Sequence, residues 1–146
     1  MSTTTKPTKR PEFRNINLSD LMGYASKMPI AAKVSILHRI SGMLMFLLLP
    51  FIVWLFDNSV SSQVSWERFT GLFSGTLGMP GWFYKLIALA LIWAFLHHLI
   101  AGLRHLYMDV SHSAVNKAFG RSSAIFTLVL SLGLTVLLGA KLFGLF

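Results

Sequence analysis

Three long runs of apolar residues stand out along the chain. None of them contains Asp, Glu, Lys or Arg, and they cover Ile40–Phe56, Leu86–Leu103 and Ser122–Ala140. A helix needs about 20 apolar residues, or roughly 17 to 25 with tilt, to cross the hydrocarbon core of a bilayer. A lone segment can satisfy its backbone hydrogen bonds in lipid only as a helix. The pattern therefore predicts an all-α integral membrane protein with three transmembrane helices, over about residues 34–57, 82–106 and 122–144.

The chain divides into a polar tail, residues 1–33, and a three-helix membrane domain, residues 34–146. Apolar residues recur at helical spacing from Leu18 to Ala25, which favours a short helix lying at the membrane surface. Pro50 lies inside the first apolar run, where it is expected to kink the helix because it lacks a backbone N–H.

The composition agrees with a membrane protein and excludes several classes of site. Of the 146 residues, 54% are hydrophobic and 12% are charged, whereas soluble domains carry about 25% charged residues. The chain has no cysteine, so it supplies neither disulfides nor thiolate ligands for iron–sulfur clusters. The net charge of +8 does not indicate a nucleic-acid partner, because the basic residues lie beside the apolar runs and are expected to contact membrane lipid.

The distribution of Lys and Arg predicts the orientation of the spans. The basic residues before the first run are Lys6, Lys9, Arg10, Arg14, Lys27 and Lys33. The second connection and its borders hold Arg104, Lys117 and Arg121, against Arg68, Lys85 and Lys141 on the other side. Cytoplasmic flanks are richer in basic residues. We therefore expect a cytoplasmic N-terminus and a C-terminus on the opposite side of the membrane.

The second predicted helix carries two histidines that share one face. His98 and His105 lie about 20° apart around the axis and about 10 Å apart along it, with Gly102 between them on nearly the same face. One imidazole on this face can reach a haem iron and the other the propionates, while Gly102 lets the flat ring approach. Ordinary hydrogen bonds between these histidines and neighbouring helices are the alternative. His97 points about 100° away, as a hydrogen-bonding or lipid-interface residue, and Arg104 points away from His105.

The start of the first predicted helix carries a second polar group. Ser35 and Arg39 are four residues apart and share a face, and His38 flanks that face. A hydroxyl and a fixed cation at the membrane edge suit a quinone carbonyl above an apolar wall. The alternative is that Ser35 caps the helix while Arg39 reaches out to lipid phosphate. Asp109 is expected either to pair with Arg104 or a partner subunit, or to be a solvated loop charge.

Two segments together resemble one known family. Ser35-Ile-Leu-His-Arg-Ile-Ser-Gly42, after Arg10-Pro11 in a basic tail, resembles the start of the cytochrome b556 subunits of succinate dehydrogenase. His98-Leu-Ile-Ala-Gly-Leu-Arg-His-Leu-Tyr-Met-Asp109 looks like the second signature of that family. Both motifs occur in the right order on the right spans, so the resemblance covers essentially the whole chain. The tail departs from the commoner family version, because Arg10-Pro11 is followed by Glu-Phe-Arg rather than Ser-Pro-His.

The resemblance implies roles for individual residues. His98 matches the axial ligand of haem b, and His105 matches a histidine near the haem propionates. Ser35 and Arg39 match residues of the ubiquinone pocket, while His38 matches a position beside both haem and quinone. Arg39 and Gly102 are also expected in the haem environment.

The resemblance further implies that the chain is a membrane anchor of succinate:quinone oxidoreductase, respiratory complex II, in a bacterial inner membrane with a periplasmic C-terminus. Its expected partners are the flavoprotein subunit, the iron–sulfur subunit and a second small anchor subunit that supplies the other haem ligand. The chain itself is not expected to oxidise succinate, because it has neither a dinucleotide-binding fingerprint nor cysteines. A cofactor-free helical accessory or assembly protein is the alternative, with the same polar residues joining helices.

Overall fold

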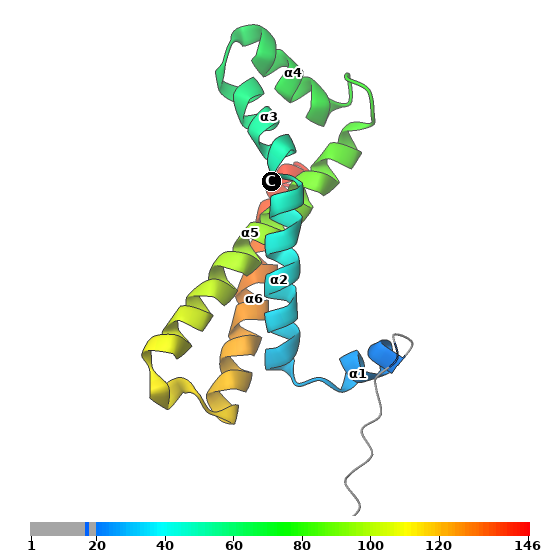
Figure 1. Ribbon diagram of the computed structural model, residues 1–146. Helices are drawn as coiled ribbons and strands as arrows, with labels where there is room; N and C mark the ends of the chain where they lie inside the picture. Colours follow the sequence, from blue (N-terminus) through cyan, green and yellow to red (C-terminus); the bar gives the residue numbers. More distant parts are fainter. Residues whose placement is uncertain (1–16, 18–19) are drawn as a thin grey trace, which may run out of the picture.

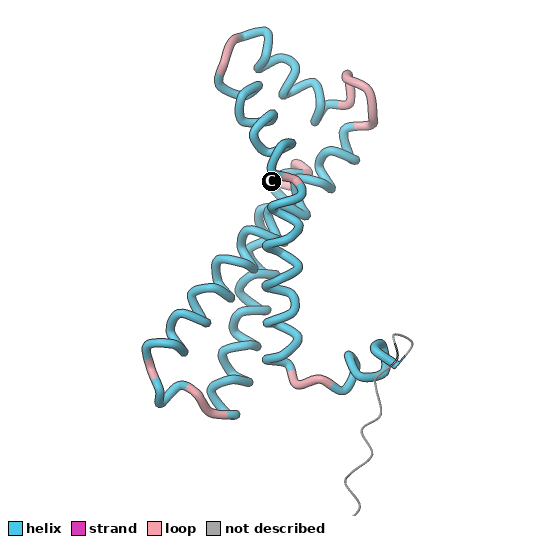
Figure 2. Tube along the Cα trace, viewed as in Figure 1, coloured by secondary structure: helices cyan, strands magenta, loops and turns pink. Residues whose placement is uncertain are grey.

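A computed structural model describes residue 17 and residues 20–146 of the chain. Three of its helices are long and apolar enough to cross a membrane: α2 (Ile30–Leu47), α5 (Gly81–Val110) and α6 (Lys117–Leu142). They form a bundle in which α5 runs antiparallel to both α2 and α6 (Figure 1). At the usual rise per residue they measure about 27, 45 and 39 Å. The expected all-α membrane fold is confirmed, and the part of the chain described contains no strand (Figure 2).

The N-terminal segment and the α5–α6 connection lie at the same end of the bundle (Figure 1). The short helix α1 (Leu21–Lys27) turns away from the bundle and ends before Pro29, as the apolar spacing predicted. The connection between α5 and α6 contains one 3₁₀ turn, η2 (His112–Ala114). Most of the basic tail, residues 1–16, lies outside the described residues.

The first apolar run forms two helices, which corrects the expected single helix over residues 34–57. α2 begins four residues earlier than expected, directly after Pro29, and ends at Leu47. A second helix, α3 (Leu49–Val60), starts with Pro50 in its first turn. Proline removes one intrahelical hydrogen bond and its ring clashes with the preceding turn, so the expected kink at Pro50 is a break in the helix.

Beyond this break the chain forms a helical hairpin at the far end of the bundle (Figure 1). α3 packs against α4 (Gln63–Ser74). Ser62 and Ser65 form a reciprocal capping box at the start of α4, which satisfies backbone N–H groups that otherwise have no partner. Gly75 ends α4 in the left-handed conformation, with φ of 82°, where glycine avoids the steric cost of a side chain.

Small side chains let the three long helices approach closely. Val34 of α2, Ala101 of α5 and Ala124 of α6 are completely buried against one another. The buried residues of α6 recur every three or four positions: Gly120, Ala124, Thr127, Ser131, Thr135 and Gly139. Helices in lipid associate through such close packing, because lipid tails are as apolar as the side chains. The packing sets the distance between α2 and α5, on which the polar cluster depends.

Candidate functional site: a histidine cluster between α2 and α5

His38 of α2 and His98 of α5 lie face to face. Their ring centroids are 4.1 Å apart and their planes are inclined by 23°. His98 Nδ1 lies 3.0 Å from the backbone oxygen of His38 and 3.3 Å from Ser41 Oγ. The Ser41 hydroxyl already donates to the same backbone oxygen at 2.8 Å. Because a carbonyl only accepts, His98 Nδ1 carries the proton and donates it.

Two glycines make this contact between the helices possible. A side chain at Gly42 would bring its Cβ within 2.8 Å of His98 Cε1, so only glycine leaves room for the ring there. A Cβ at Gly102 would lie 3.5 Å from His38 Nε2, which is an ordinary contact. Gly102 therefore faces His38, and the space above it is partly filled by that ring rather than open.

The other predicted site residues lie nearer the α1 end of the bundle. The ring of His105 is 5.3 Å from that of His38. Ser35, Arg39 and Gly42 fall within about 60° of one another around α2, so the polar pair shares the side of α2 on which His98 packs. Ser35 and Arg39 precede Gly42 by about 10 and 5 Å along the axis. Ser35 is half-buried and Arg39 is exposed.

Ser35 is not a helix cap, which removes one of the two alternatives for this residue. α2 begins at Ile30, so Ser35 lies in the second turn, beyond the backbone N–H groups that a cap satisfies.

His97 belongs to the opposite face of α5 and packs into the bundle interior. It is completely buried, and its Nδ1 lies 3.2 Å from Ser131 Oγ on α6. The indole of Trp93 stacks on it at 5.5 Å. His97 is thus a hydrogen-bonding residue between helices and not a lipid-interface residue.

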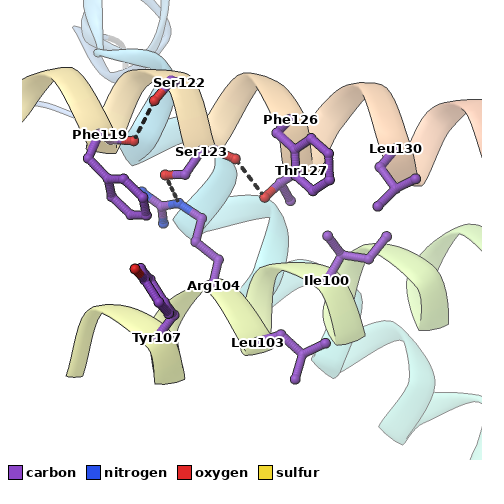
Figure 3. Close-up of a pocket in the computed structure, with 10 residues that line it drawn as sticks. All are labelled: Ile100, Leu103, Arg104, Tyr107, Phe119, Ser122, Ser123, Phe126, Thr127 and Leu130. Carbon is purple, nitrogen blue, oxygen red and sulfur yellow. Dashed lines mark hydrogen bonds between the residues drawn. The ribbon is translucent and has the colours of Figure 1, made fainter. Parts of the chain in front are cut away.

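Arg104 follows the same inward face and joins α5 to α6. Its Nε donates to Ser123 Oγ at 2.9 Å and one Nη donates to the backbone oxygen of Gly120 at 3.3 Å. Figure 3 shows the guanidinium reaching across to α6, beside an open groove of 540 Å³. Arg104 itself lines this groove, together with Tyr107, five apolar residues and the hydroxyl side chains of Ser122, Ser123 and Thr127. None of the histidines lines this groove. Asp109 is exposed, and the guanidinium contacts α6 instead of this carboxylate.

Sequence reasoning missed Ser41, Gly42 and Ser131, which support the histidines. Ser41 and Gly42 directly follow the Ser35–Arg39 segment, so their proximity in sequence was a usable signal. Ser131 is a polar residue in the middle of the third apolar run, where polar groups usually have a partner.

The arrangement gives His98 the properties of a metal-ligating imidazole. Ligating histidines commonly donate their second ring N–H to a backbone carbonyl or carboxylate, which fixes the ring and its tautomer. With Nδ1 donating to His38, the lone pair of Nε2 is available to a ligand. The fold and this cluster define a class: small all-α membrane subunits with polar side chains on facing helices.

The comparisons identify the family within this class. Residues 14–138 match the family described as the succinate dehydrogenase/fumarate reductase transmembrane subunit, and the chain belongs to this family. A relative from Coxiella burnetii (strain RSA 493 / Nine Mile phase I), named succinate dehydrogenase cytochrome b556 subunit, is 38% identical over 112 residues. The match covers 76% of this chain and 84% of the relative. The resemblance carried by the two sequence motifs is therefore confirmed.

The His97–Ser131 contact predicts a stability effect. Ser131→Ala removes only the hydroxyl and leaves the buried Nδ1 of His97 without a partner, which costs about 1–3 kcal/mol. We expect a lower thermal unfolding midpoint of the detergent-solubilised protein. Ser122→Ala, on the exposed side of the same helix, is the matched control. Equal midpoints for the two variants would contradict a stabilising role of the contact.

Proposed function

We propose that the chain is a membrane anchor of succinate:quinone oxidoreductase that holds one side of a haem b and forms part of the ubiquinone site. Family membership supports the anchor role, in a complex with flavoprotein and iron–sulfur subunits. The name of the Coxiella relative, a cytochrome b556 subunit, supports haem b. The observation that carries the haem proposal is the hydrogen bond from His98 Nδ1 to the backbone oxygen of His38.

The residues around His98 fit a haem. Nε2 of His98 is the proposed iron ligand, since Nδ1 is committed to the backbone. His38 Nε2 is buried without a hydrogen-bond partner, and such a group normally has one. A bound haem would supply partners on this face, with His105 nearer the membrane surface for the propionates. When bound, haem b supplies one-electron transfer at a potential that depends on its ligands and surroundings.

A second histidine for a bound haem is proposed to come from another subunit. His38 stacks directly on His98, with ring centroids 4.1 Å apart, and so leaves no room for a haem between the two rings. His97 points into the bundle interior and bonds to Ser131. His105 is two turns along α5, about 10 Å from His98. His112 follows the end of α5 in the connection to α6. A second small anchor subunit with a histidine in one of its own spans would complete the site.

Ser35 and Arg39 are proposed to bind the quinone headgroup. Both lie on the side of α2 that also carries Gly42, against which His98 of α5 packs. Both lie closer than His98 to the α1 end of the bundle. In the orientation expected from the basic residues, this end is cytoplasmic, on the side where electrons from succinate would arrive. The Ser35 hydroxyl would donate to one quinone carbonyl, and the Arg39 guanidinium would stabilise the negative charge that develops on reduction. Partner subunits would close the pocket and supply the iron–sulfur centres.

The central experiment compares His98→Ala with His97→Ala in the purified complex. We expect His98→Ala to lose the b-type spectrum and His97→Ala to keep it, because the ring of His98 lies in the cluster between α2 and α5, whereas that of His97 is completely buried inside the bundle. Haem per complex is measured by pyridine haemochrome analysis. Gly42→Val should also lose haem, since it displaces the His98 ring, whereas Gly133→Val meets nothing within 4 Å and is the control. A colourless wild-type complex would favour the cofactor-free accessory protein.

Substitution of Ser35 or Arg39 by Ala should separate two activities of the complex. Reduction of ubiquinone should fall about tenfold or more, since loss of one hydrogen bond to a developing charge costs roughly 2–4 kcal/mol. Succinate oxidation with an artificial acceptor should persist, because neither residue is expected to contact the succinate site. Ile36→Ala, on the neighbouring exposed face of α2, is the control. Parallel loss of both activities would indicate failed assembly, and unchanged quinone kinetics would refute the assignment.

The shared haem site predicts that this chain alone does not form a six-coordinate cytochrome. The chain is expressed in a haem-sufficient membrane, first alone and then with its anchor partner. The low-spin spectrum of two axial histidines is expected only on co-expression. The same spectrum from the chain alone would refute the shared haem site and would indicate that His38 is the second ligand.

A further inference from the structure

An open cavity of 920 Å³ lies at the α1 end of the bundle, away from the histidine cluster. It is bounded by the first residues of α2, the last turns of α5 and the first turns of α6. Three of its lining residues are cationic, Arg104, Lys117 and Arg121, and none is acidic. The start of α6 adds to this charge, because the backbone N–H groups of a helix N-terminus carry partial positive charge. The cavity therefore favours an anion.

Arg104 is the buried member of this group. It is 9% exposed, and its two hydrogen-bond partners, Ser123 Oγ and the Gly120 backbone oxygen, are both neutral. A guanidinium has five N–H donors, so these two bonds leave others available. A buried charge without an opposite charge is costly, and an anion in the adjoining cavity would lower that cost. Arg104 also lies about 9 Å inside the end of α5, at the depth where headgroups meet acyl chains.

Apart from Asn116, the remaining residues that line the cavity are apolar. They include Ile30 at the start of α2, Met108 on α5 and Ile125 on α6. Gly120 is part of the wall, and a side chain built there would meet nothing within 4 Å. The cavity thus combines cations with an apolar surface that runs along the spans. Free phosphate would gain nothing from contact with this apolar surface, whereas a lipid acyl chain would pack against it.

We propose that this cavity binds one phospholipid with an anionic headgroup. The phosphate lies between Lys117, Arg121 and the guanidinium of Arg104, and an acyl chain runs down the wall past Ile125. This site is separate from the proposed haem and quinone sites, because His98, Ser35 and Arg39 do not line the cavity. Its occupancy does not depend on whether those assignments hold.

The test measures phospholipids that remain bound to the purified complex after detergent washing. The double variant Lys117→Gln/Arg121→Gln removes two cations and is expected to lose one anionic phospholipid per complex. Lys85→Gln/Lys141→Gln, at the opposite end of the bundle, also removes two cations; it is the charge-matched control and should retain the lipid. Gly120→Leu fills the cavity without changing charge and should cause the same loss, while Gly133→Leu on the outer face should not.

Two further measurements distinguish a lipid from the other possible occupants of the cavity. Displacement of the lipid by millimolar inorganic phosphate would overturn the proposal in favour of a phosphate site. Cross-links from residue 117 or 121 to a partner subunit, unchanged by delipidation, would show that protein covers the cavity and would also overturn it. Equal lipid retention in all variants would refute the site. Haem content is measured in the same samples, so loss of haem with normal lipid retention would count only against the haem proposal.

Discussion

The close approach of α5 to both of its neighbours is the constraint on which the rest of the structure depends. In a bilayer no hydrophobic driving force brings helices together, so their association relies on tight packing and on hydrogen bonds between helices. Ala101 and Ala124 supply the packing at the point where α2, α5 and α6 meet. Gly42 then allows the His98 ring to reach the backbone of α2. A larger residue at any of these positions would separate the polar groups that the bundle brings together.

The helical period gives α5 two faces with different contacts: one packs against α6 and the other against α2. Ala94, His97, Ala101 and Arg104 are buried and recur at three- and four-residue spacing, and both His97 and Arg104 reach α6. His98, Gly102 and His105 recur at the same spacing one residue later and lie against His38. Two adjacent histidines therefore have unrelated environments, one sealed inside the bundle and one with a ring nitrogen turned away from the backbone. The inner face positions the outer one, since rotating α5 would break the bonds to Ser131 and Ser123.

Much of this arrangement could be predicted from the sequence, because periodicity alone separates the two faces of one helix. The separation of His97 from His98, and the direction of Arg104 away from His105, follow from about 100° per residue. What could not be predicted depends on contacts between distant segments. The role of Gly42 needs the position of His98, 56 residues later in the chain. The alternative that Ser35 caps the helix failed because α2 begins directly after Pro29, more than one turn before Ser35. Hydropathy could not tell a kink at Pro50 from a full break.

The histidine cluster between α2 and α5 is incomplete within this chain, which agrees with its assembly with partner subunits. Polar groups inside a membrane are expensive, yet Nε2 of His38 is buried without a hydrogen-bond partner and the ring of His98 is only half-buried. Nε2 of His97 also lacks a partner, but Nδ1 of His97 and the guanidinium of Arg104 are bonded to α6. The inner face is therefore held by bonds within the chain, whereas the outer stripe, with Arg39 exposed and His98 half-buried, is accessible for completion from outside. The outer stripe runs from His98 through His38 to Arg39 and Ser35, so whatever completes it covers the proposed haem and quinone positions together. Assembly and electron transfer would then depend on the same surface, because the contact that relieves the exposed polar groups also brings the remaining ligand and the quinone pocket into place.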